Sequence, residues 1–204
     1  MKKLFLCSLF KNVAGHLKIY AGGNLQGQTV AYIPTAAKPN NLVFHVNYTR
    51  KLLVKLGLVV EELELTTAGE AEVIQKLQGS DIIYVGGGNT FFLLQWMNQT
   101  GAGSLIKTQV HAGKLYVGES AGAILPASNI EYSQDMDDPG VAPDLTDYAG
   151  LGMIDFYPLP HMRDFTQRKA VKAILSQYEA ILPLVPITNS QLILVRGDEM
   201  EVVN

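Results

Sequence analysis

Short runs rich in β-branched and aromatic residues alternate along this chain with longer segments of helical periodicity. Such alternation is typical of βαβ units, in which parallel strands are joined by crossover helices. Runs such as Asp81–Val85 (Asp-Ile-Ile-Tyr-Val) are apolar almost throughout, as expected of strands that helices cover on both faces. The pattern therefore predicts an α/β fold, a three-layer doubly wound sandwich around a mainly parallel central sheet.

The elements can be placed along the chain from this periodicity and from the turn residues between them. Predicted strands span Lys3–Phe10, Gln28–Ile33, Val59–Leu65, Asp81–Val85, Lys114–Val117, Leu151–Tyr157 and Gln191–Val195, and the last of these begins a closing hairpin. Predicted helices span Asn41–Leu56, Ala68–Leu77, Thr90–Asn98, Gly103–Ala112 and Asp164–Glu179, with a further helix beginning at Ala121. Tyr132–Gly150 is expected to be a long polar loop, a length usually associated with function or mobility.

Length and composition limit the classes of protein that fit. With 204 residues and 48% hydrophobic composition, the chain is expected to form one domain spanning residues 1–204. The net charge of −3 and the scattered basic residues argue against a nucleic-acid partner. No apolar run approaches the roughly 20 residues of a membrane span. A single cysteine, Cys7, excludes an internal disulfide, so we expect a cytoplasmic protein.

Gly118-Glu-Ser120-Ala-Gly122 lies between a predicted strand and a predicted helix. A Gly-x-Ser-x-Gly sequence in that setting is typical of a nucleophile elbow, in which a sharp turn exposes the serine hydroxyl. The same residues could instead serve only tight packing, with Ser120 capping the helix. The setting favours Ser120 as a catalytic nucleophile.

A serine hydroxyl needs a base within hydrogen-bond reach, and the chain has four histidines. His16, His45 and His111 have ordinary structural roles in a polar segment, in a helix and at a helix end. His161 differs, because Pro158-Leu-Pro160 delivers it from a predicted strand to a loop at the edge of the sheet. We therefore predict that His161 is the general base.

A second glycine-rich turn, Gly86-Gly-Gly88, also joins a predicted strand to a predicted helix. Consecutive glycines can present backbone N–H groups to an anion, and the helix N-terminus adds partial positive charge. No Gly-Lys-Ser/Thr sequence follows, so the turn is not a P-loop. Beside a serine nucleophile, the turn favours an oxyanion hole formed by the N–H groups of Gly88 and Ala121.

Four segments in this order carry a resemblance to a known family: Ile33-Pro-Thr-Ala36, Val85-Gly-Gly-Gly-Asn-Thr-Phe91, Gly118-Glu-Ser-Ala-Gly-Ala123 and Pro160-His161. Together they resemble peptidase E, a family of aspartyl dipeptidases, and its cyanophycinase relatives. The resemblance covers nearly the whole chain. It implies a class I glutamine amidotransferase-like fold and a serine exopeptidase that cleaves dipeptides with an N-terminal aspartate.

The resemblance also implies roles for individual residues. Ser120 and His161 match the family's nucleophile and histidine, and Asp135 falls where the family has an aspartate associated with activity. Asn189 stands where an acidic partner is expected near the C-terminus, and an amide can orient an imidazole but cannot stabilise imidazolium by charge. Asp135 is therefore the candidate third member or a nearby electrostatic contributor, although aspartates in such loops commonly form turns. Asn89, Thr90, Gln134 and Arg163 are candidate substrate-binding residues.

The expected reaction is acyl transfer through an acyl-enzyme on Ser120, with a small peptide substrate and without a metal or organic cofactor. Two alternatives remain open from the sequence. The chain could be an esterase-type acyl hydrolase, or a catalytically silent relative that binds an acidic amino acid or peptide, which the Asn189 substitution makes credible. The sequence leaves open whether the protein is a monomer or a homodimer.

Overall fold

A computed structural model describes residues 1–204 and contains one large sheet and one small sheet. The strand order of the large sheet is β3-β2-β4-β5-β1-β8-β9. The strands β1 to β5 are mutually parallel. β8 pairs antiparallel with β1 and forms a hairpin with β9, which is the edge strand. These strands span Lys3–Cys7 (β1), Thr29–Ile33 (β2), Val59–Glu62 (β3), Ile82–Val85 (β4), Leu115–Glu119 (β5), Leu192–Arg196 (β8) and Glu199–Val203 (β9). The mainly parallel sheet and the closing hairpin are confirmed.

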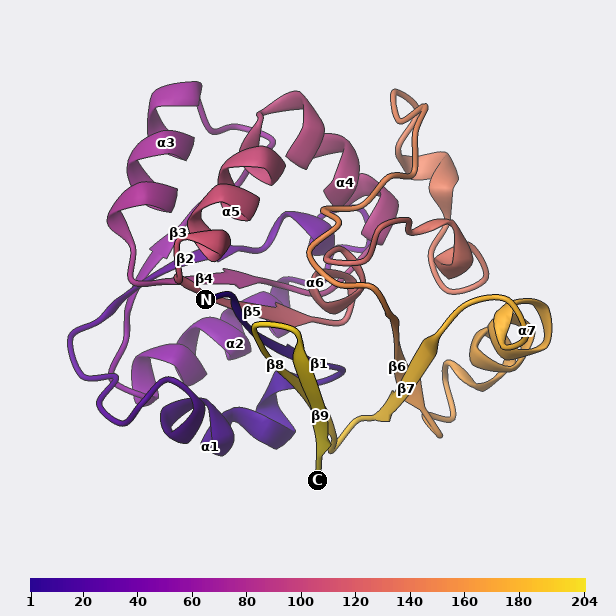
Figure 1. Ribbon diagram of the computed structural model, residues 1–204. Helices are drawn as coiled ribbons and strands as arrows, with labels where there is room; N and C mark the ends of the chain where they lie inside the picture. Colours follow the sequence, from indigo (N-terminus) through magenta and orange to yellow (C-terminus); the bar gives the residue numbers. More distant parts are fainter.

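Helices cover both faces of the large sheet, as Figure 1 shows. One layer contains α1 (Phe10–Tyr20) and α2 (Val43–Lys55), and the opposite layer contains α3 (Glu70–Gly79), α4 (Thr90–Gln99), α5 (Ala102–His111) and the short α6 (Ala121–Ile124). Successive residues of β1 alternate between the two apolar cores: Leu4 and Leu6 pack beneath the second layer, and Phe5 and Cys7 pack beneath the first. The three-layer sandwich is therefore present.

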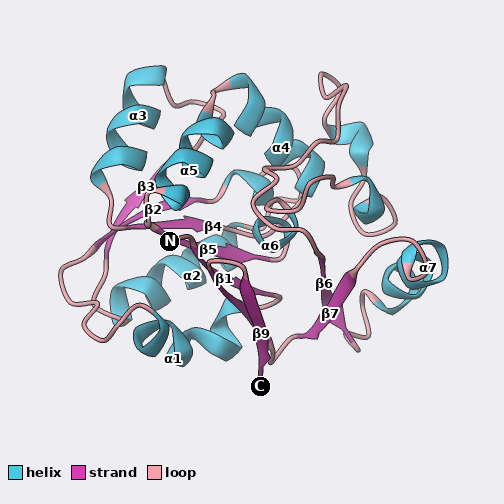
Figure 2. Cartoon of the chain, viewed as in Figure 1, coloured by secondary structure: helices cyan, strands magenta, loops and turns pink.

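The small sheet lies beside the large one and consists of the parallel strands β6 (Tyr157–Met162) and β7 (Leu184–Thr188), joined through α7 (Arg168–Tyr178) (Figure 2). The predicted strand Leu151–Tyr157 is wrong for all but its last residue. The buried apolar residues of this segment lie alongside the residues that end α6: Leu151 N–H donates to Leu125 O, and Met153 N–H donates to Pro126 O. Burial alone therefore produced a strand-like pattern in an irregular segment.

The first predicted strand, Lys3–Phe10, is too long, and α1 replaces its last residue. No side chain near Leu9 caps this helix locally. Instead, the Phe10 N–H donates to Oε1 of Glu119 at 2.8 Å, across from the end of β5. A tertiary contact therefore sets the beginning of α1, which local sequence does not reveal.

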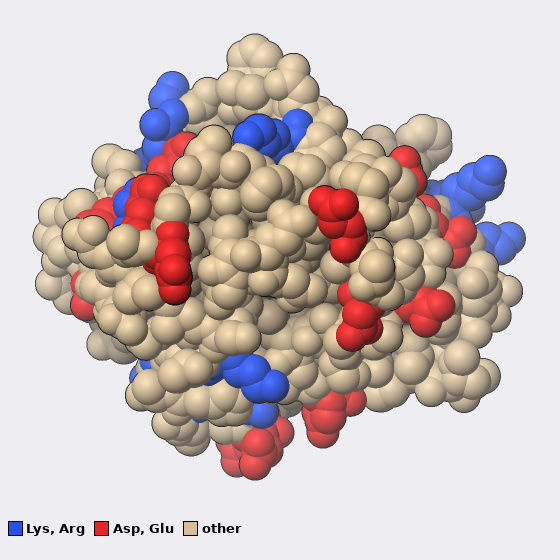
Figure 3. All heavy atoms as spheres, turned by 90° about the horizontal axis from the view of Figure 1, so that it is seen from above, with Lys and Arg blue, Asp and Glu red and all other residues tan.

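The remaining segments are short 3-10 helices and loops. The 3-10 helices span Thr35–Ala37, Glu131–Ser133 and Pro139–Val141, and the last two interrupt the predicted long loop. No helix combines the length and the apolar character needed to cross a membrane. On the face shown in Figure 3, lysine and arginine side chains lie in small separate groups.

Candidate active site

Ser120 lies at the carboxyl end of β5, immediately before α6. Its backbone is strained for a residue with a side chain, with φ 51° and ψ −110°. The flanking glycines are required by space, because a Cβ on Gly118 would lie 2.2 Å from Gly122 O and one on Gly122 would lie 2.1 Å from Val85 O. The predicted strand, sharp turn and helix around Ser120 are therefore all present.

His161 is the residue that meets the serine hydroxyl: its Nε2 lies 2.8 Å from Ser120 Oγ. It lies within β6, where the register with β7 is irregular, rather than in the loop predicted after a strand. Its φ of 64° turns the backbone sharply. Its N–H donates to Oγ of the buried Ser8 at 3.0 Å, and Ser8 in turn contacts the carbonyls of Ile187 and Thr188. Ser8 thereby fixes His161 to both sheets.

Asn189 takes the place beside the imidazole. Its Oδ1 lies 2.9 Å from His161 Nδ1, and its Nδ2 donates to Asp164 Oδ2 at 2.6 Å. A carboxylate can only accept, so the amide nitrogen faces Asp164 and the amide oxygen faces His161. The oxygen then accepts from Nδ1–H, which leaves Nε2 free to accept the proton of Ser120. Hydrogen bonds from Thr166 and then from Asn189 lower the pKa of Asp164 to about 2.

Asp135 lies away from this pair. It is exposed, and its Oδ2 accepts from Gln177 Nε2 at 3.2 Å. The structure thus gives Asp135 no contact with His161, and the position next to the imidazole belongs to Asn189. The expectation that Asp135 completes the triad is corrected accordingly, because the loop that carries it turns toward α7.

The turn Gly86-Gly-Gly88 lies against the nucleophile. A Cβ on Gly87 would be 3.0 Å from Ser120 Cβ, and Gly88 has φ 143° and no room for a side chain beside Ala36 O. The N–H groups of Gly87 and Gly88 donate to no other group of the protein. Ala121 is the first residue of α6, where N–H groups have no intrahelical acceptor. Gly88 and Ala121 therefore remain our candidate oxyanion donors.

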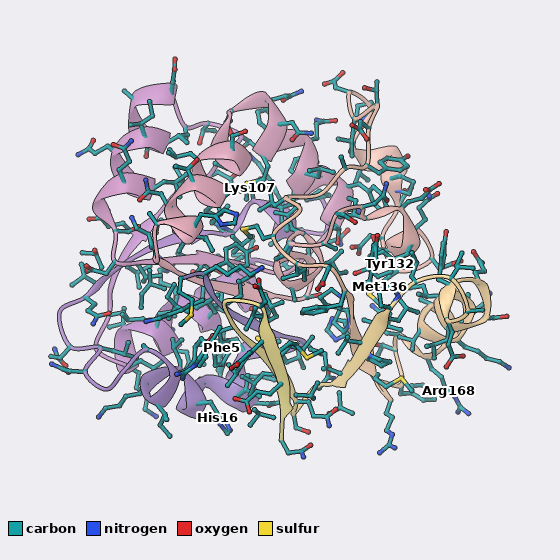
Figure 4. All side chains as sticks on the ribbon, in the orientation of Figure 1. Phe5, His16, Lys107, Tyr132, Met136 and Arg168 are labelled. Atoms are coloured by element: carbon teal, nitrogen blue, oxygen red, sulfur yellow. The ribbon has the colours of Figure 1, made fainter.

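A cavity of about 280 Å³ opens at Ser120. It is small for a ligand site, since such pockets typically range from about 300 to 1,000 Å³. Met136, which contributes to its wall, lies on the side of the molecule where β6 and β7 are found (Figure 4). No lysine or arginine lines it. The lining residues are Ser8, Leu9, Asn40, Leu42, His45, Gly87, Gly88, Glu119, Ser120, Met136, Asp137, His161 and Gln167.

None of the four predicted substrate-binding residues lines this cavity. Asn89 caps α4 by accepting from Phe92 N–H, and its amide donates to Asp138 O. Thr90 is buried and bonded to Asp137, and Gln134 is exposed. Arg163 lines two other surface pockets. Their closeness to the motifs in sequence therefore does not place them in the lining of the Ser120 cavity.

The cavity also contains three ionisable residues that were not among the candidates: His45, Glu119 and Asp137. For His45 the sequence predicts only an ordinary place in a helix, and it predicts no catalytic role for Glu119 or Asp137. The sequence contains one indication of these residues, since Glu119 is a charged residue inside the glycine-flanked elbow around Ser120. Burial raises the pKa of Asp137 to about 6, although hydrogen bonds from Thr90 oppose the shift. No cluster of three or more His, Cys, Asp or Glu side chains is arranged to hold a metal ion.

Related proteins share this sequence and architecture. The chain is 46% identical to an uncharacterized peptidase of Listeria innocua over 98% of its length and 95% of the relative's, and 44% identical to one of Pasteurella multocida over 97% and 95%. Peptidase E of Salmonella arizonae is 35% identical over 64% of this chain and 55% of that protein.

A crystal structure of a peptidase E-like protein from Listeria monocytogenes has the same α/β fold, with a TM-score of 0.94 and 43% identity over 100% of this chain and 98% of that one. A peptidase structure from an acI-B1 Actinobacterium, 21% identical, shares the fold with a TM-score of 0.75 over 100% and 87% of the two chains. The family model for peptidase family S51 matches residues 8–203. The chain therefore belongs to peptidase family S51.

Proposed function

We propose that this S51 family member is a serine peptidase that acts on small peptides through Ser120, His161 and Asn189. The observation that carries the proposal is the 2.8 Å contact between Ser120 Oγ and His161 Nε2, on a strained elbow that faces unpaired N–H groups. Such a contact is the geometric requirement for activating a serine hydroxyl.

In the proposed reaction, Ser120 Oγ attacks the scissile carbonyl while His161 Nε2 takes its proton. The N–H groups of Gly88 and Ala121 stabilise the oxyanion. His161 then gives the proton to the leaving amine, and the C–N bond breaks to leave an acyl group on Ser120. Water, losing a proton to His161, attacks this ester and releases the acid, and the proton returns to Ser120.

The pocket favours a different specificity from the aspartyl preference that the peptidase E resemblance implies. Recognition of an aspartyl side chain calls for a cation or several donors near the nucleophile. Here the lining carries the carboxyl groups of Glu119 and Asp137, no lysine or arginine, and only the imidazoles of His45 and His161 as basic groups. We therefore propose that the enzyme accepts small neutral residues on the acyl side and does not select aspartate.

Hydrolysis of alanyl, leucyl and aspartyl 4-nitroanilides, and of the corresponding dipeptides, by the wild type and Ser120→Ala tests this function. We expect turnover of the alanyl dipeptides that falls by at least about 10⁴-fold in the variant. Selective turnover of aspartyl substrates would refute the proposed specificity and favour an aspartyl dipeptidase instead. Faster turnover of short-chain esters than of any amide would favour the esterase alternative. Binding without turnover would identify a silent binder.

A further inference from the structure

Glu119 is a buried carboxyl group directly beside the nucleophile, and the proposed reaction does not use it. Its side chain is 1% exposed. Oε1 accepts from the Phe10 N–H at 2.8 Å, and Oε2 accepts from the Tyr84 hydroxyl, also at 2.8 Å. Burial, followed by the charge of Glu119, holds the pKa of Tyr84 well above its ordinary value, so Tyr84 remains a donor. Both carboxyl oxygens of Glu119 therefore act as hydrogen-bond acceptors in this buried environment.

The third partner of Glu119 is His45, in the first turn of α2. His45 Nε2 lies 3.2 Å from Glu119 Oε2, and its side chain is 31% exposed, in the wall of the Ser120 cavity. Its Nδ1 makes no hydrogen bond within the protein. The hydrogen bond to Glu119 raises the pKa of His45, against opposing effects from burial and from Lys11. The cavity thus contains a second imidazole, one with a carboxylate directly behind it.

The two histidines of the cavity have opposite partners. His161 has the neutral amide of Asn189 behind it, which suits a base that begins each cycle unprotonated. His45 has a carboxylate behind it, which suits an imidazole that carries a positive charge. No lysine or arginine lines the cavity, so a negative group on a ligand has no other side-chain cation to meet.

An opposite charge lies in another wall of the same cavity. Asp137 uses Oδ2 to accept from the N–H and hydroxyl of Thr90, and its Oδ1 makes no hydrogen bond within the protein. A cavity of about 280 Å³ with an imidazole on a carboxylate and a free carboxyl oxygen matches a small molecule with one charge of each sign. A free dipeptide is such a molecule.

We propose that His45, held by Glu119, binds the free C-terminal carboxylate of a dipeptide, while Asp137 receives its α-ammonium group. This inference rests on the proposed peptidase function and on the dipeptide substrates that the peptidase E resemblance implies, and it names the residues that bind the two charged ends of such a substrate. His45 is then a substrate-binding residue, and Glu119 is a positioning residue that orients the imidazole and favours its charged form.

The inference is tested by asking how well alanyl-alanine and alanyl-alanine amide protect Ser120 from labelling by a fluorophosphonate. The wild type should be protected by the free acid at a concentration at least about tenfold lower than by the amide, the factor expected for one charge-assisted hydrogen bond. This preference should fade as the pH rises and His45 loses its proton. The other titratable or charged groups of this site are Glu119, which bonds to His45, Tyr84, which bonds to Glu119, Lys11, whose charge opposes that of His45, and Asp137 and His161, which line the same cavity.

His45→Gln is the critical variant, because glutamine can still bond to Glu119 but carries no charge. We expect it to lose the preference for the free acid, with protection by each peptide measured relative to the variant's own labelling rate without peptide. His111→Gln, which changes an exposed histidine at the end of α5, is the matched control and should keep the preference. Equal protection by acid and amide in the wild type, or an unchanged preference in His45→Gln, would overturn the inference.

The failure of the proposed function has a different signature. In that case the fluorophosphonate does not modify Ser120 in the wild type, and calorimetric titration with the same two peptides replaces the protection assay. A preference for alanyl-alanine that depends on His45 would then support the binding site without the reaction. No preference in the titration would refute both.

Discussion

Asn189→Asp places a carboxylate beside the imidazole of His161, and the structure predicts that this change raises the reactivity of Ser120 only when Asp164 is changed as well. In the wild type, the Asn189 amide spans the gap between His161 Nδ1, at 2.9 Å, and Asp164 Oδ2, at 2.6 Å. An aspartate at position 189 would attract a positive imidazole on one side. On the other side it would face the carboxylate of Asp164, which is already an acceptor.

The two effects are of similar size. Asp164 is partly exposed, so a dielectric constant near that of water, about 80, is the suitable choice. Unit charges separated by the 2.9 Å of the His161 contact then attract by about 1.4 kcal/mol, and charges separated by the 2.6 Å of the Asp164 contact repel by about 1.6 kcal/mol. Because a repulsion of this size turns the new carboxylate away from His161 Nδ1, the single variant should change the reactivity of Ser120 by less than about threefold. Asn189→Asp combined with Asp164→Asn should raise it roughly tenfold.

The assay is the second-order rate of fluorophosphonate labelling of Ser120 at neutral pH, which needs no knowledge of the substrate. Asp164→Asn alone should slow labelling, because the Asn189 amide loses the charged acceptor that orients it. Urea unfolding of each variant checks that the fold is retained. An acceleration by Asn189→Asp alone that equals that of the double variant would refute the reasoning, since Asp164 would then have no influence on position 189.

Three further predictions concern stability, each measured by urea unfolding. Gly122→Ala should lower the free energy of unfolding by about 3 kcal/mol, because the new Cβ would lie 2.1 Å from Val85 O; Gly69→Ala, with nothing within 4 Å, is the control and should change it by less than about 1 kcal/mol. Burial raises the pKa of Asp137 from 3.8 to about 6, so the folded protein favours the protonated carboxyl group. The free energy of unfolding should therefore fall by about 3 kcal/mol as the pH rises from about 4 through 6 and this group ionises. Asp137→Asn should flatten this part of the pH profile, and an unchanged slope would contradict it. Asn89→Ala should cost about 1 to 2 kcal/mol through loss of the α4 cap, whereas an unchanged midpoint would show that water replaces the amide.

Sequence alone determined the features of this protein that depend on neighbouring residues. Three such features are local patterns: the apolar runs of β2, β4 and β5, the elbow around Ser120, and the glycine turn before α4. Each is visible in the sequence because the backbone conformation of a short segment restricts which side chains that segment can carry. His161 could also be selected from the two prolines before it, although these prolines lie with it in β6 rather than in a loop after a strand. The α/β class follows from the alternation of these local elements.

Tertiary structure decided what depends on residues far apart in the chain. α1 begins at Phe10 because Glu119 accepts from its N–H, and the segment Leu151–Phe156 is irregular because it bonds to the end of α6. The choice of Asn189 over Asp135 beside His161, and the meeting of His45 with Glu119, arise where separate loops converge at the carboxyl ends of the strands. No local periodicity encodes such contacts, because their energies come from the relative positions of whole elements rather than from any one segment.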